Sequence, residues 1–269
     1  MLDVHPPHSP THTWKDFFIH IATICVGLLI AVSLEQTVEA IHHRHQRHQL
    51  EEQLRTESLH NMNLSLQDID RLTELQARII AQYTELQAAP REHRAPQWLH
   101  RLSAQNIKPS STAWVVAQEN ATLGLLPLAQ SQRYVRVYSV VDSVNSSLYD
   151  QLSFIRKTDT ALWPALLFDK FDPQGAQAPT YDLSRMTADQ LRLLSESLAE
   201  LGAINSYCIN RNRLLYGVNW ATWHGYGSEE KTVRVAFAIT SVPGGKAAML
   251  DRYPLPEEAK LFTNIEGDR

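Results

Sequence analysis

The longest apolar run of the chain lies near its N-terminus and predicts a membrane-spanning helix. Residues 17–34 read FFIHIATICVGLLIAVSL and carry no formal charge before Glu35. At about 1.5 Å per residue, a helix of this length approaches the roughly 30 Å hydrocarbon core of a bilayer. We therefore expect an irregular tail over residues 1–16 and a single transmembrane helix over residues 17–34.

The same helix is predicted to continue as a juxtamembrane stalk over residues 35–89. No glycine or proline occurs between Gly27 and Pro90, so nothing in that stretch breaks a helix. Apolar residues recur there at helical spacing and predict one buried face. That face consists of Leu59, Met62, Leu66, Ile69, Leu72, Ile79, Tyr83 and Leu86. Residues 90–109 contain three prolines and are expected to be a linker.

Residues 110–214 are predicted to form a helical bundle domain. Between Pro127 and Trp163-Pro164, seam positions are separated alternately by four and three residues, as in a bundle or coiled coil. The seam consists of Tyr134, Tyr138, Val141, Asn145, Leu148, Leu152, Ile155, Asp159 and Leu162. Thr187 and Gln190 match the capping box of a further helix, in which Gly202 is a candidate break.

The pattern changes in residues 215–269, which we expect to be irregular with a small β element. Val233, Val235, Phe237 and Ile239 alternate with other residues, and a period of two is typical of a half-buried strand. The best candidate partner is the stretch 214–222. One interpretation is a small hairpin over the bundle, and the other is an edge strand that pairs with another chain. The predicted fold class is therefore mainly α, with a small β element near the C-terminus.

Small residues recur at every fourth position along one face of the predicted spanning helix. Such a stripe lets a second helix approach closely. It continues in register with apolar residues beyond the membrane. The predicted helix–helix interface consists of Thr23, Gly27, Ala31, Leu34, Val38 and Ile41. The alternative is a chance pattern, because small residues are frequent in spanning helices.

Histidines and arginines crowd into residues 42–48, directly after this stripe. Glu39, His42, His45 and His48 could share one helix face and are the candidate ligands of a transition metal. The alternative is a collar that meets lipid headgroups, with imidazoles that change charge near neutral pH. Because one helix offers few ligands, a closed metal site would need more than these residues.

Composition excludes one class of partner and leaves the cysteines uninformative. The formal net charge of -4 and the isoelectric point near 6.3 provide no basic face for nucleic acid. Cys25 lies in the apolar run and Cys208 far along the chain, so the cysteines indicate no disulfide framework.

The apolar run has one alternative interpretation, a cleaved signal peptide. Ala31-Val32-Ser33 loosely resembles a cleavage site, but the positively charged start of a signal peptide is missing, because Lys15 is offset by Asp16. The membrane orientation stays open. Lys and Arg around the span lean toward a cytoplasmic C-terminal domain, whereas a short N-terminal apolar helix is also the form of a signal anchor that exports the domain after it.

Several runs of the N-terminal half resemble a group of uncharacterised bacterial single-pass membrane proteins. They are HPPH, TWKDFFIHIATICVGLLIA, SLEQTVE, HHRH and TAWVVAQENATLGLLP, the last followed by a Tyr-rich helix. The resemblance covers residues 1–65 and 112–138. It implies a bacterial cell (inner) membrane location and no known activity. Cys25 departs from the group, which often has another apolar or small residue there.

These patterns favour a membrane-anchored, non-enzymatic scaffold or interaction protein that self-associates and needs no cofactor. Its expected partners are the lipid bilayer, a second copy and a protein partner. One alternative is a pH- or metal-responsive sensor that uses the collar of residues 42–48. Another is a membrane-tethered enzyme, although the spacing of its candidate residues reveals no nucleophile and base. Those residues are Tyr207, Arg211, Arg213, Trp220, Trp223, His224 and Tyr226.

Overall fold

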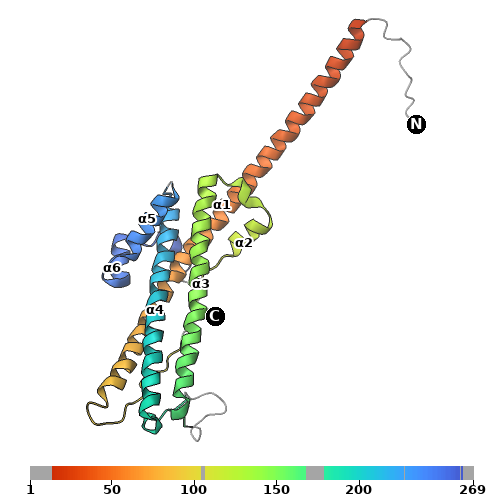
Figure 1. Ribbon diagram of the computed structural model, residues 1–269. Coiled ribbons are helices and arrows are strands. Elements are labelled where there is room, and N and C mark those ends of the chain that lie inside the picture. Colours follow the sequence, from red (N-terminus) through yellow and green to blue (C-terminus); the bar gives the residue numbers. More distant parts are fainter. Residues whose placement is uncertain (1–13, 104–106, 168–178, 227, 261, 263–269) are drawn as a thin grey trace. The chain divides into compact units, whose positions relative to one another are not determined.

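The protein is mainly helical (Figure 1). A computed structural model describes residues 14–103, 107–167, 179–226, 228–260 and 262. Most of the predicted tail, 1–16, lies outside these residues. The elements are α1 (Trp14–Ala88), α2 (Thr112–Glu119), η1 (Thr122–Leu125), α3 (Leu128–Leu162), η2 (Trp163–Ala165), η4 (Leu183–Arg185), α4 (Ala188–Trp223), α5 (Glu229–Thr240), α6 (Gly245–Arg252) and α7 (Glu257–Lys260).

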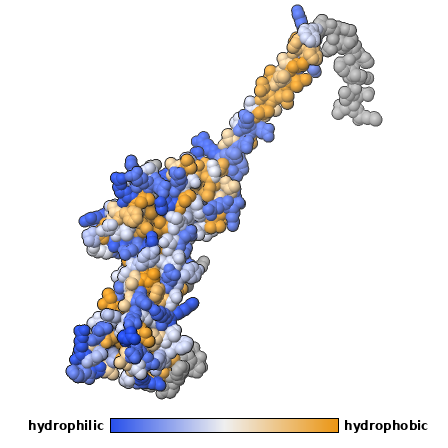
Figure 2. Space-filling model, viewed as in Figure 1, coloured by the Kyte–Doolittle hydropathy of each residue, from blue (hydrophilic) through white to orange (hydrophobic). Residues whose placement is uncertain are grey.

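The chain divides into two compact units, and the first ends at Glu51. In this unit α1 exposes its apolar side chains, including Leu28, Leu29 and Ile30, which are all more than half exposed. Figure 2 shows them as a band of hydrophobic surface. None of the most apolar 18-residue window is buried by the rest of the chain, and by length and composition this helix could cross a membrane. Signal sequences near an N-terminus share these properties.

The second unit begins at Glu52 and contains the rest of α1 together with α2 to α7. Seven of the eight residues of the predicted apolar face are buried, and the exception, Tyr83, is 38% exposed. Leu54, which lies outside the predicted face, is fully buried as well. The second half of the predicted stalk is therefore part of the bundle, because its apolar face is covered by other helices.

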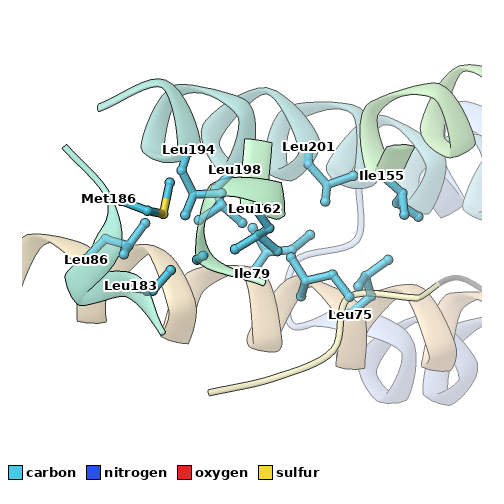
Figure 3. Close-up of a cluster of buried hydrophobic side chains, with 12 residues drawn as sticks. Leu75, Ile79, Leu86, Ile155, Leu162, Leu183, Met186, Leu194, Leu198 and Leu201 are labelled. Atoms are coloured by element: carbon cyan, nitrogen blue, oxygen red, sulfur yellow. The ribbon is translucent and has the colours of Figure 1, made fainter. Parts of the chain in front are cut away.

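Two clusters of apolar side chains make up the core of the second unit. Figure 3 shows the cluster in which α1, α3 and α4 meet, with Leu162 and Leu198 among its buried members. The other cluster joins α1 and α4 to α5, α6 and α7 around Tyr216 and Met249, which have no exposed surface. Burial of each large apolar side chain contributes about 1.5–3 kcal/mol. The two clusters fix the part of α1 between Leu59 and Leu86 against α4.

Local sequence signals define the helix ends as predicted. Helix α1 stops two residues before Pro90, and α3 begins directly after Pro127. The capping box of α4 is present, since the side chains of Thr187 and Gln190 each bond the other residue's backbone N–H. The candidate break at Gly202 is wrong, because α4 continues through this residue. Proline and capping chemistry act on neighbouring residues alone, which is why these boundaries can be predicted without the fold.

The predicted β element is wrong, since the described part of the chain contains no strand. The alternating stretch belongs to α5, which begins after Ser228, whose hydroxyl accepts from the Lys231 N–H at 3.3 Å. Thr232, Ala236 and Ile239 are its fully buried residues, whereas Phe237 is 57% exposed. The burial therefore follows the helical spacing of four and three. The supposed partner strand, 214–222, lies inside α4.

Candidate functional site

The six residues of the predicted interface lie exposed on α1, in the first unit. Leu34, Val38 and Ile41 are each more than 60% exposed, and a side chain added at Gly27 would meet nothing within 4 Å. The hydroxyl of Thr23 donates to the Ile19 carbonyl at 2.9 Å, so it is satisfied within its own helix. This face can therefore enter an apolar environment without an unpaired hydroxyl.

The histidine collar is also exposed, and its candidate ligands do not gather. The Glu39 carboxylate lies 4.0 Å from the imidazole of His43, which is not among the proposed ligands. The ring of His45 instead lies 2.9 Å from the Gln49 amide. Across the residues that the structure describes, no group of three His, Cys, Asp or Glu side chains could hold a metal ion. A metal role for Glu39, His42, His45 and His48 stays a prediction that needs ligands from elsewhere.

The aromatic residues considered for an enzyme separate into packing contacts. Trp220 and His224 stack with ring centroids 3.7 Å apart, and the His224 Nδ1 lies 2.8 Å from the Trp220 carbonyl oxygen. Trp223 lies under the Arg55 guanidinium at 3.8 Å. Tyr207 and Arg211 pair with each other farther back along α4. The Arg55–Trp223 contact joins the end of α4 to α1, whereas the other two contacts lie within α4 and its C-cap.

Other members of that set also bond backbone carbonyls. Arg213 donates to the Val242 carbonyl at 2.6 Å, and the carbonyl of Tyr226 accepts from Arg133 at 3.0 Å. The indole N–H of Trp220 donates to the Pro254 carbonyl at 3.0 Å. The bonds of Arg213 and Trp220 hold the C-terminal segment against α4, and the bond to Tyr226 joins the loop after α4 to α3.

Sequence reasoning missed a buried carboxylate, Glu57, at the meeting point of α1, α2 and α3. Tyr138 and Ser110 donate their hydroxyls to it, and so does the backbone N–H of Ala113 at the start of α2. Burial, and then the Glu57 carboxylate, hold the pKa of Tyr138 well above its usual range. Trp114 stacks on Tyr138 with ring centroids 4.8 Å apart. Glu57 thus has hydrogen-bond partners from three segments and joins α1 to α2 and α3.

A second buried carboxylate, Asp68, lies deeper in the bundle and is 1% exposed. It accepts from the Asn212 amide at 2.8 Å and from the backbone N–H of Ile107. Burial raises the pKa of Asp68 to about 6, against the smaller effects of those two bonds and of Arg71. The core of this bundle therefore holds a carboxyl group whose charge changes in the mildly acidic range.

Buried polar residues spaced seven or, in one case, fourteen residues apart form what we call the buried polar ladder. Asn205 on α4 bonds to both other long helices. It accepts from Gln151 on α3 at 2.6 Å and donates to Gln76 and to the Leu72 carbonyl on α1 at 2.8 Å. All its members are at most 2% exposed. They are Asn61, Asp68 and Gln82 on α1, Gln151 and Thr158 on α3, and Asn205, Asn212 and Asn219 on α4.

Two members of the ladder join α4 to the other long helices, Asn205 through Gln151 on α3 and Gln76 on α1, and Asn212 through Asp68 on α1. Buried polar side chains at seam positions specify register, because a shifted helix would leave them unpaired. The seven-residue spacing of Asn205, Asn212 and Asn219 is visible in the sequence and could have identified this feature.

Comparisons of this chain with protein-family models, with curated proteins and with solved structures find no match. The functional argument therefore depends on the residues described above.

Proposed function

We propose that this protein is a membrane-anchored interaction protein that self-associates through the N-terminal part of α1 and presents its helical bundle to a protein partner. The observation that carries the proposal is the apolar window of α1, none of which the rest of the chain buries. A soluble chain rarely exposes so continuous an apolar surface, and a bilayer would cover it. The bacterial cell membrane is the expected location, on the strength of the sequence resemblance.

Self-association is supported by the side chains beyond the apolar window. Val38 and Ile41 stay exposed past its end, on the face that continues the small-residue stripe. Two copies of α1 packed along this face would cover both side chains and bring Gly27 of each helix into close contact. The predicted dimer thus accounts for apolar residues inside and outside the bilayer with one interface.

Gly27→Leu is expected to reduce dimer formation by roughly tenfold, which is equivalent to about 1.4 kcal/mol. The larger side chain would hold the two helices apart at their closest approach. The measurement is chemical crosslinking of the full chain in native membranes, with dimer yield determined at several expression levels.

Ala22→Leu is the matched control, because it adds similar bulk about 140° around the same helix. Dimer yield should be retained in this variant. An unchanged yield in Gly27→Leu would remove the proposed interface, and an equal loss in both variants would show that the effect is not specific to this face.

A further inference from the structure

The second unit contains a cavity of about 460 Å³ between α1 and the C-terminal helices α6 and α7. This volume lies in the range of small-molecule sites, about 300–1,000 Å³. No member of the buried polar ladder lines it. Its lining comes from Asn63, Leu66 and Gln67 on α1, Lys246 and Leu250 on α6, Pro254 and Leu255 in the following loop, and Glu257 and Lys260 on α7.

Apolar and polar residues together define the chemistry of this cavity. Leu66, Leu250, Pro254 and Leu255 provide apolar walls, whereas amide, ammonium and carboxylate groups are contributed by the others. The two lysines of the cavity come from separate helices, and each pairs with a carboxylate, Lys246 with Asp70 and Lys260 with Glu257. A ligand that fits such a lining has an apolar body and a polar head.

One buried amide lining the cavity has unused hydrogen-bonding capacity. Asn63 is 3% exposed, and its Nδ2 has no hydrogen-bond partner among the described residues. An unsatisfied buried donor costs about 1–3 kcal/mol. The Nδ2 atom is itself buried, so a ligand acceptor recovers this cost when the Asn63 side chain turns Nδ2 toward the cavity; such a head group carries acceptor oxygens.

Lys246 adds a second available donor. Its ammonium group donates to the Leu66 carbonyl at 3.3 Å and to the Asp70 carboxylate. An ammonium group has three N–H donors, so one is left after these two bonds. The side chain is 28% exposed, and a charged hydrogen bond formed here is stronger than one to a neutral group.

We propose that this cavity binds a monocarboxylate with an apolar tail, such as a medium-chain fatty acid. The carboxylate accepts from Asn63 and Lys246, and the tail lies against the four apolar residues. A neutral head would lose the charged bond to Lys246, and a quaternary ammonium head could accept from neither Asn63 nor Lys246. The site is independent of the proposed dimer interface, which lies in the other unit.

The test is photolabelling of the full chain in zwitterionic lipid nanodiscs with a diazirine-bearing dodecanoate. Mass spectrometry is expected to find the label on Leu250, Leu255 or their neighbours. Excess decanoate should remove this labelling, whereas decanol and decyltrimethylammonium should compete at least about tenfold more weakly, the ratio expected for loss of one charged hydrogen bond.

Two variants connect the labelling to the named donors. Lys246→Met and Asn63→Leu should each reduce labelling at this site about tenfold, while Lys231→Met, an exposed lysine on α5, should leave it unchanged. If Asn63→Leu does not fold, the Lys246→Met result decides. Labelling that is spread over the chain, equal competition by decanol, or unchanged labelling in Lys246→Met would overturn the proposal.

Discussion

Replacing Asp68 with asparagine is expected to raise the free energy of unfolding by about 2 kcal/mol near neutral pH and to have almost no effect near pH 4. Burial raises the pKa of this carboxyl group from 3.8 to about 6. That pKa difference corresponds to about 3 kcal/mol. The free energy of unfolding is lower by this amount when Asp68 is charged in the core. Some of the gain in the variant is offset, since hydrogen bonds to a neutral amide are weaker than those to a carboxylate.

The sign follows from comparing the folded and unfolded chains. With the higher pKa, the native state binds the proton more tightly than the unfolded state, so folding is favoured as the proton binds. Asp68 therefore makes the folded protein more stable as the pH falls from about 6 to about 4. The full cost of the buried charge is present only well above pH 6, where Asp68 is ionised in the folded protein. The pH dependence that Asp68 contributes should disappear in Asp68→Asn.

Urea unfolding of the full chain in mild detergent, followed by circular dichroism at several pH values, measures this difference. Asp142→Asn is the matched control, because Asp142 is an exposed carboxyl group on α3. It should change the free energy of unfolding by less than about 0.5 kcal/mol at every pH. A loss of stability in Asp68→Asn near neutral pH would show that the charged form of Asp68 stabilises the bundle.

The seam of α3 shows which part of the core could be predicted from sequence. The alternating spacing in α3 correctly identifies Tyr138, Leu148 and Ile155 as buried. Between Val141 and Leu148, and again between Ile155 and Leu162, two adjacent positions fit the alternating spacing equally well. The prediction took Asn145 and Asp159, whereas the fully buried positions are Val144 and Thr158.

The choice between the two positions depends on which residues pack against each one. The hydroxyl of Thr158 accepts from that of Ser197 on α4 at 3.2 Å, a contact made across 39 residues of sequence. No pattern within α3 contains this information. The same limit applies to Glu57, whose partners Ser110 and Tyr138 come from segments far along the chain.

The misassigned β element has a different cause. All residues from Leu215 to Ala221 are buried in α4, so this stretch has no polar face that would reveal the helical period. In α5 a chance alternation of valines concealed the buried residues Thr232 and Ala236. Ser228 and the two glutamates after it are helix start signals. They indicate the helical structure of this stretch more reliably than the alternation of apolar residues does.

The close packing of α4 on α5 depends on Gly217, and Gly217→Ala is expected to lower the free energy of unfolding by about 2 kcal/mol. A Cβ atom at this position would lie 2.9 Å from the Ala236 Cα and 3.0 Å from its carbonyl oxygen. Both atoms belong to the backbone of α5, so the helix itself would have to move. This cost exceeds the roughly 1 kcal/mol that alanine gains over glycine in a helix.

Gly202→Ala separates the steric effect from helix propensity, because Gly202 lies in the same helix. A Cβ atom there would meet side-chain atoms of Ile79 and Gln76 at 3.5 and 3.6 Å, which is ordinary contact. This variant should therefore be about 0.5–1 kcal/mol more stable than the parent. Thermal and urea unfolding of both variants would measure the contrast. Equal stabilisation by the two substitutions would show that α5 does not pack on α4 as closely as described, whereas opposite signs would support α5 as a helix fixed at Gly217.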